Sequence, residues 1–138
     1  MSLVKWDKSF SVGVREMDEQ HVVLIDLINT FYDRIGKGER KENFSTLLQG
    51  LKEYAEMHFV VEEDYMLLFG FDGYQEHKNE HDKFLEKVEE FEAKLMQGEL
   101  LLSYDVLSFL SLWLVDHMKG VDKKYTDIFL ANGLDRVS

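Results

Sequence analysis

Apolar residues recur along most of this chain at alternating steps of three and four, the spacing that places side chains on one face of an α-helix. Such stripes cover four segments, at about residues 16–35, 41–69, 74–97 and 103–117. The fourth segment begins at Ser103, a candidate N-cap, and the helix is expected to break near Gly120. A shorter amphipathic segment follows at 121–130. The pattern predicts an all-α protein with four long helices and a short C-terminal helix.

The connections between the stripes are short, so consecutive helices should be antiparallel neighbours. Glycines stand where helices are expected to end, at Gly36, Gly70 and Gly98. The residues before the first stripe include Trp6 and Phe10 and are too apolar for a free arm. We therefore expect an up-down-up-down four-helix bundle with an extended N-terminal arm that folds back over one face. The whole chain, residues 1–138, should form a single domain.

Composition and charge narrow the class of protein. The chain contains no Cys and no Pro, which excludes disulfide bonds and favours long helices. Its formal net charge of −11 argues against nucleic acid and anionic membrane surfaces as partners. The start of the chain does not resemble a signal peptide, and the longest apolar-rich stretch, 106–115, is too short to span a bilayer. We expect a soluble, cytoplasmic monomer without membrane insertion.

Seven ionisable residues lie on the apolar stripes or just beyond them. They include all five histidines of the chain: His21, His58, Glu62, His77, His81, His117 and Asp122. A buried ionisable side chain is costly unless it is hydrogen-bonded, paired or bound to metal. A single histidine of this kind is more often a hydrogen-bonded core residue, but this explanation is much weaker for the whole set.

The spacing of these residues favours one shared site. His58 and Glu62 are four residues apart, as are His77 and His81, so the members of each pair share one face of a helix about one turn apart. In an antiparallel bundle, the start of one helix lies level with the end of the next. The other two histidines, near the start of the first helix and the end of the fourth, should therefore meet these pairs at one end of the bundle.

The step of five residues from His117 to Asp122 is irregular, because on a regular helix it turns the carboxylate away from the histidine. Gly120 lies between them and could allow a break or bulge that brings Asp122 back toward the site. A simple helix end at Gly120 is the alternative interpretation.

The number of possible ligands indicates the kind of metal site. Five imidazoles and two carboxylates exceed the four ligands of a tetrahedral zinc ion, and nitrogen and oxygen ligands without thiolate suit iron or manganese. Two metal ions with two bridging carboxylates and a bridging oxide or hydroxide would leave one of about twelve octahedral positions open. Ferritin-like sites use Glu-x-x-His pairs, and no Glu stands three residues before any histidine here.

Four stretches of sequence together resemble the hemerythrin family, and its bacterial single-domain branch in particular. They are WDKSFSVGVREMDEQH near the start, HFVVEE, HKNEH and WLVDHMKGVD, and the resemblance runs from Trp6 to about Tyr125. It implies two iron ions in an oxo- or hydroxo-bridged centre, with O2 as the ligand. It also implies these ligand sets: His77, His81 and His117 for one iron, His21 and His58 for the other, and Glu62 and Asp122 as bridges.

The same resemblance implies an apolar oxygen pocket, and the positions that match its lining are Phe59, Trp113, Leu114, Met118 and Tyr125. Met118 stands where a branched aliphatic residue is more usual, and plain core packing is the alternative role for all five. The implied function is reversible oxygen binding, for carriage, storage or delivery to an oxygen-consuming partner protein, and not enzymatic activity. The alternatives are a di-iron enzyme acting on peroxide, nitric oxide or ferrous iron, and an oxygen or iron sensor module.

Overall fold

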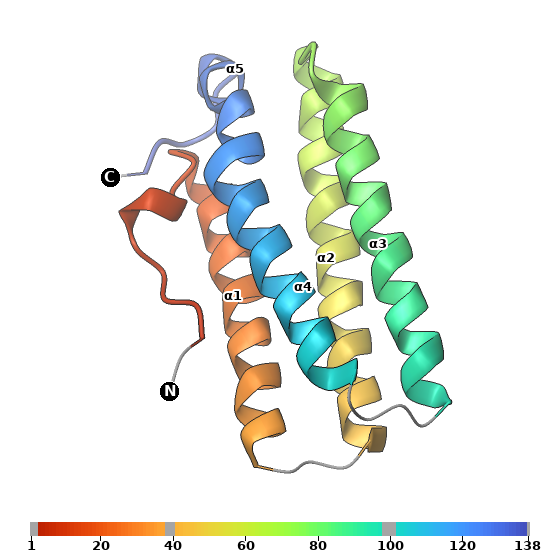
Figure 1. Cartoon of the computed structure of the whole chain (residues 1–138). Helices are drawn as coiled ribbons and strands as arrows, with labels where there is room; N and C mark the ends of the chain where they lie inside the picture. The colour runs from red at the N-terminus through yellow and green to blue at the C-terminus, as the bar shows by residue number, and fades with distance from the viewer. Residues whose placement is uncertain (1–2, 38–40, 98–101, 138) are drawn as a thin grey trace.

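Four long helices form the body of the protein in the computed structural model, which describes residues 3–37, 41–97 and 102–137. Their bounds are α1 Arg15–Gly36, α2 Lys41–Phe69, α3 Tyr74–Met96 and α4 Leu102–Asp116. The helices lie side by side and alternate in direction (Figure 1), with the start of α1 level with the end of α2. The predicted up-down-up-down four-helix bundle is therefore confirmed.

The chain continues beyond α4 without a break at Gly120. A π-helix, η2 (His117–Val121), leads into a 3₁₀-helix, η3 (Asp122–Tyr125), and then into the short helix α5 (Thr126–Ala131). The predicted C-terminal helix is confirmed, but its predicted start at residue 121 is wrong because Val121 closes the π-turn. The expected break is instead a local widening of a continuous helix.

The N-terminal arm runs beside α1 (Figure 1) and contacts the π-helix η2, which confirms the expected return over one face. It contains a short 3₁₀-helix, η1 (Lys8–Phe10), whose Phe10 side chain is buried. Asp18 of α1 fixes the following residues, because its carboxylate accepts hydrogen bonds from Ser11 Oγ at 2.6 Å and Val12 N at 2.8 Å. The arm is therefore attached by both apolar packing and hydrogen bonds.

The helix ends agree with most of the glycine predictions. Helix α1 ends at Gly36, and Gly70 adopts a left-handed conformation with φ +70° just after α2. Ser103 was expected as an N-cap, but it lies inside α4, which begins at Leu102, so this prediction is wrong. Gly98, expected to end the third helix, lies outside the described residues.

The apolar interior is divided into two parts by a layer of buried polar side chains. The main core, which includes Leu24 and Phe59, fills most of the bundle. The end cluster lies under α5 and consists of Val12, Val14, Met17, Met66, Tyr125 and Phe129. Along α1, His21 lies between Met17 of the end cluster and Leu24 of the main core. The polar layer is thus closed off by apolar packing above and below. Among the described residues, no helix has both the length and the apolar character needed to cross a membrane.

Candidate metal centre

The polar layer consists of the seven ionisable residues on which the sequence analysis depended. Each has a relative exposure of 3% or less, and all lie at the end of the bundle where α1 and α3 begin. His21 comes from α1, and the other six come from α2, α3 and the turns that follow α4: His58, Glu62, His77, His81, His117 and Asp122. The expected convergence of these side chains is present in the structure, whereas their role as ligands stays a prediction.

The π-turn explains how Asp122 reaches this layer. A π-helix forms i→i+5 hydrogen bonds, and the backbone N–H of Asp122 donates to the carbonyl of His117. The wider turn returns the fifth residue to the same face of the helix, so His117 Nε2 lies 2.9 Å from Asp122 Oδ1. Of the two interpretations of the five-residue step, the bulge is therefore right and the simple helix end is wrong.

The two carboxylates each turn one oxygen toward one group of histidines and the other oxygen toward a second group. Glu62 Oε2 lies 3.4 Å from His21 Nε2 and 3.3 Å from His58 Nε2. Its other oxygen, Oε1, lies 3.8 Å from His77 Nε2 and 3.3 Å from His81 Nε2. A carboxylate in this position can bridge two metal ions.

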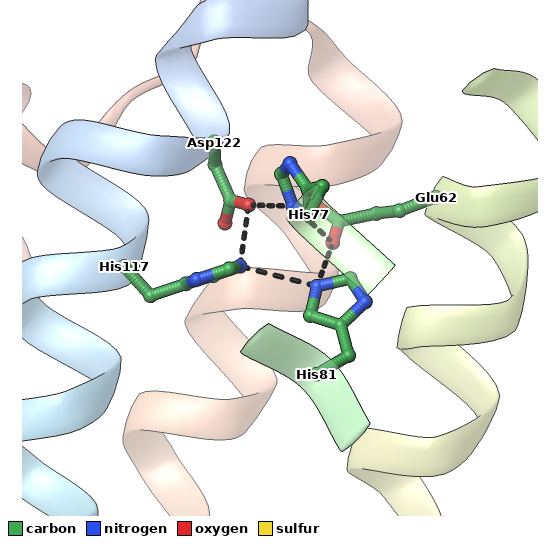
Figure 2. A group of neighbouring side chains, drawn as sticks. All are labelled: Glu62, His77, His81, His117 and Asp122. Carbon is green, nitrogen blue, oxygen red and sulfur yellow. Dashed lines mark hydrogen bonds and ion pairs between the residues drawn. The ribbon is translucent and has the colours of Figure 1, made fainter. Parts of the chain in front are cut away.

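Asp122 divides the histidines in the same way. Its Oδ1 lies 2.9 Å from both His77 Nε2 and His117 Nε2, whereas Oδ2 lies 3.0 Å from His21 Nε2. Figure 2 shows His77, His81 and His117 turned with both carboxylates toward a common centre.

Two overlapping sets of possible ligands result, and their ligand atoms lie within 4.8 Å of one another in each set. The three-histidine group consists of His77, His81 and His117 with Glu62 and Asp122, and the two-histidine group of His21 and His58 with the same carboxylates. The two groups share Glu62 and Asp122. A site for a single ion would not need this sharing.

The arrangement of the ligand atoms fits metal ions. His81 Nε2 and His117 Nε2 lie 3.1 Å apart. Two ligands about 2.1 Å from one metal ion and at right angles to each other are separated by roughly 3.0 Å. Nitrogen and oxygen ligands without thiolate match iron or manganese better than a structural zinc site.

Several ligand atoms are close together and yet lack hydrogen bonds. Neither Nε2 of His21 nor Oδ2 of Asp122 has a hydrogen-bond partner, although the two atoms are 3.0 Å apart. The same is true of Nε2 of His77 and Oδ1 of Asp122. Atoms that face a common metal ion, and not each other, would have this geometry. Buried polar atoms without partners are costly, and a bound cation would satisfy them.

The electrostatics of the layer favour charged carboxylates. Burial, the largest influence on Glu62, acts to raise the pKa of its carboxyl group, but His58, His21 and His81 together hold that pKa well below its ordinary value. The pKa of Asp122 is likewise well below its ordinary value, because His117 and His21 outweigh burial and the charge of Glu62. Both groups are therefore available as anionic ligands at neutral pH.

Burial and the neighbouring carboxylates act on three of the histidines to different extents. Burial disfavours a charged His21, yet contacts with Asp122 and Glu62 raise the pKa of His21 to about 9. Burial acts in the same direction on His117, but Asp122, Glu80 and Glu62 together raise the pKa of His117 to about 10. Burial lowers the pKa of His58. Metal binding would therefore have to displace protons from His21 and His117.

Three polar residues next to this layer were missed by the sequence analysis. Gln20 Oε1 lies 2.6 Å from His58 Nδ1, Glu63 Oε2 lies 2.8 Å from His81 Nδ1, and Glu80 Oε1 lies 3.6 Å from His117 Nδ1. Each of these residues is adjacent in sequence to a candidate ligand, and this adjacency was the available signal. Tyr125 was expected only to line the oxygen pocket, and it donates a hydrogen bond of 2.5 Å to Glu62 Oε2.

The residues expected to line an oxygen pocket lie in two places. Phe59 stacks on His81 with ring centroids 3.8 Å apart, and Trp113 stacks on His117 at 4.3 Å. Leu114 and Met118 are buried in the main core together with Phe59. Tyr125 belongs instead to the end cluster, on the other side of the polar layer.

The fold and the site define a four-helix-bundle protein with a buried metal centre of histidines and carboxylates. A family model described as the Hemerythrin HHE cation binding domain matches residues 12–128. This chain belongs to the hemerythrin family.

Named relatives agree with this assignment over most of their length. The chain is 34% identical over 126 residues to a bacteriohemerythrin of Methylococcus capsulatus, with 91% of this chain and 95% of that protein covered. It is 32% identical over 123 residues to a hemerythrin-like protein of Naegleria gruberi, with 89% and 91% covered. A crystal structure of wild-type hemerythrin superposes with a TM-score of 0.86 at 31% identity, covering 93% of this chain and 98% of that one.

Proposed function

We propose that this protein binds molecular oxygen reversibly at a centre of two iron ions. The observation that carries the proposal is the sharing of Glu62 and Asp122 between a three-histidine group and a two-histidine group. A single ion needs no such division, whereas two ions bridged by two carboxylates require it. The names of the relatives, bacteriohemerythrin and hemerythrin-like protein, support iron and oxygen in particular.

The ligand assignment follows from the two groups. The three-histidine group supplies five protein ligands and the two-histidine group four, so the second position has one ligand fewer. Bound iron would supply the electrons and the open coordination position that dioxygen needs. The residues that hold the two ions are then His77, His81, His117, His21, His58, Glu62 and Asp122.

The apolar residues around the centre exclude water. Phe59 and Trp113 cover the faces of His81 and His117, and Leu114 and Met118 are each 1% exposed. A dry environment suppresses proton transfer from solvent to reduced oxygen and so favours release of oxygen over irreversible oxidation of the metal.

Tyr125 supports the centre from the end cluster. Its hydroxyl donates to Glu62 Oε2, the oxygen that faces His21 and His58. The hydrogen bond fixes the orientation of the carboxylate and leaves Oε1 turned toward the three-histidine group. We infer a carrier or store of oxygen, or a protein that delivers it to an oxygen-consuming partner, in place of an enzyme.

The proposal is tested by loading the metal-free protein with Fe(II) under nitrogen, exposing it to oxygen and then removing the oxygen. We expect a visible absorption band that appears with oxygen, disappears in vacuum and returns over several cycles. Metal analysis of the same sample should give two iron ions per chain, and a zinc-loaded sample is the control that should stay colourless. Permanent oxidation accompanied by turnover of peroxide, nitric oxide or ferrous iron would instead support an enzyme.

A further inference from the structure

The same kind of contact links α1 to α2, α2 to α3, and α3 to the turn that follows α4. The residue beside a ligand on one helix reaches the outer ring nitrogen of a ligand on the following helix. Gln20 of α1 contacts His58 of α2, and Glu63 of α2 contacts His81 of α3. Glu80 of α3 approaches His117, which follows α4.

The partners of the two histidine groups differ in charge. Within the three-histidine group, His81 Nδ1 contacts the carboxylate of Glu63 at 2.8 Å and His117 Nδ1 lies 3.6 Å from the carboxylate of Glu80. The second distance is longer than a hydrogen bond but within the range of an ion pair. In the two-histidine group, His58 Nδ1 contacts the neutral amide of Gln20.

The remaining ring of the two-histidine group has no such support. His21 Nδ1 is buried and has no hydrogen-bond partner and no ion-pair partner among the described residues. His117 Nδ1 also lacks a hydrogen bond, but the carboxylate of Glu80 lies 3.6 Å from it. Both negative partners among these outer contacts therefore belong to the three-histidine group.

The two histidine groups also differ in how neighbouring aromatic rings pack against them. Phe59 and Trp113 lie nearly parallel to His81 and His117, with interplanar angles of 7° and 13°. His21 and His58 meet each other edge to face at 75°, and His58 is only tilted against Phe59, at 51° and 5.9 Å. Two of the three rings in the three-histidine group, those of His81 and His117, are thus held by stacking before any metal binds.

Both differences affect metal affinity. A carboxylate that accepts the Nδ1–H of a histidine fixes the tautomer with a free lone pair on Nε2 and makes that nitrogen a better donor to a metal ion. Two additional negative charges near one position also favour a cation there over the other position. Rings that are already oriented lose less conformational entropy when they coordinate.

We propose that Glu63 and Glu80 are positioning residues that make the three-histidine group the tighter metal position, so that the first metal ion bound by each chain enters there. The two-histidine group then fills second and more weakly. This inference rests on the proposed two-metal centre and adds an order of filling to it.

The order of filling is tested with Co(II) under nitrogen, because Co(II) is coloured and its absorption depends on its coordination. Wild-type protein should bind two Co(II) ions in two resolved steps. His58→Ala should keep the tighter step and lose the weaker one, whereas His77→Ala should lose the tighter step. Wild-type protein that binds no more than one Co(II) would defeat the two-metal centre itself.

The role of Glu63 is tested with two substitutions. One removes both its charge and its hydrogen bond, and the other removes the charge alone. Glu63→Ala should weaken the first Co(II) step by about 10- to 100-fold and leave the second unchanged. Glu63→Gln keeps an accepting oxygen, so we expect a smaller loss at the same step. Glu80→Gln should act in the same direction but less strongly, because its contact is longer.

Matched controls separate these effects from net charge and folding. Glu56 and Glu86 are exposed glutamates on the same two helices, and Glu56→Gln and Glu86→Gln should leave both steps unchanged. Gln20→Glu should strengthen the second step by placing a carboxylate beside His58. The proposal is overturned if Glu63→Ala leaves both steps as they were, or weakens both equally with unchanged helical content.

Discussion

Tyr125 donates a hydrogen bond of 2.5 Å from its phenol oxygen to Glu62 Oε2, and both side chains are fully buried. The pKa of Tyr125 is raised well above its ordinary value by burial and by the negative charges of Glu62 and Asp122, so the hydroxyl stays protonated and remains a donor. The end cluster is thereby connected to the candidate metal centre. Its packing holds the residue that orients one of the two shared carboxylates.

Replacing Tyr125 with phenylalanine tests this connection. Tyr125→Phe keeps the ring and removes the donor, so Glu62 Oε2 loses a buried hydrogen bond. We expect the free energy of unfolding of the metal-free protein, measured in urea, to fall by about 1.5–3 kcal/mol. Metal affinity should fall by about 10-fold. The control Tyr104→Phe, at an exposed site, should change the free energy of unfolding by no more than about 0.5 kcal/mol, and an equal effect of both substitutions would contradict this role.

Met118 is the residue of the apolar wall that departs most from the expected family pattern. Met118→Ala should leave a cavity in the main core beside the centre, since the side chain is 1% exposed. We expect a loss of about 2–5 kcal/mol in the free energy of unfolding and a faster conversion of the oxygen-loaded sample to the oxidised form. Absorption spectra recorded over time measure the conversion. Met57→Ala, at a site with 42% exposure, is the control, and an unchanged rate of conversion in Met118→Ala would show that this residue does not exclude water.

Gly120 was expected to permit the irregular turn between His117 and Asp122, but the structure gives it no special requirement. Its φ is not positive, and a Cβ atom placed there would meet nothing within 4 Å. Gly120→Ala should therefore leave metal affinity unchanged and stabilise the protein by up to about 1 kcal/mol. Gly70→Ala is the contrasting variant, because φ +70° is unfavourable for alanine and should cost about 1–2 kcal/mol. Loss of metal binding in Gly120→Ala would instead show that the turn between His117 and Asp122 requires glycine at this position.

Metal uptake should release protons, and the pKa values of the histidines determine how many are released at each pH. At pH 7 the metal-free protein holds protons on His21 and His117, whose pKa values are raised to about 9 and about 10. A histidine must be neutral to bind a metal ion, so uptake at pH 7 should release at least two protons per chain. The number should decrease as the pH rises through 9 and 10, because the free protein has then already lost these protons, and metal affinity should rise over the same range. Calorimetry in buffers of different ionisation enthalpy measures the count, and no proton release at pH 7 would contradict the assignment.

The bundle could be predicted because the spacing of residues within each segment is enough to identify a helix and the face that it buries. Residues four apart on a helix, such as His77 and His81, share a face in any helical protein, and antiparallel order then fixes which helix ends meet. The position of Asp122 was harder to predict, since its side chain reaches the site only through a π-turn that no single residue requires.

The outer contacts could not be derived from the sequence for a different reason. Glu63 contacts His81 on another helix, not a ligand on its own, so its role depends on the relative rotation of two helices. The hydrogen bond from Tyr125 to Glu62 joins residues 63 positions apart and depends on how the end cluster packs. Such relationships follow from tertiary packing and not from periodicity.

The central claim is that two carboxylates are shared between two metal ions, and anomalous X-ray diffraction from iron-loaded crystals tests it most directly. Two anomalous peaks per chain are predicted, roughly 3.5–4 Å apart. One peak should lie beside Nε2 of His77, His81 and His117, and the other beside Nε2 of His21 and His58, with oxygens of Glu62 and Asp122 between them. A single peak, or peaks away from these atoms, would contradict the account.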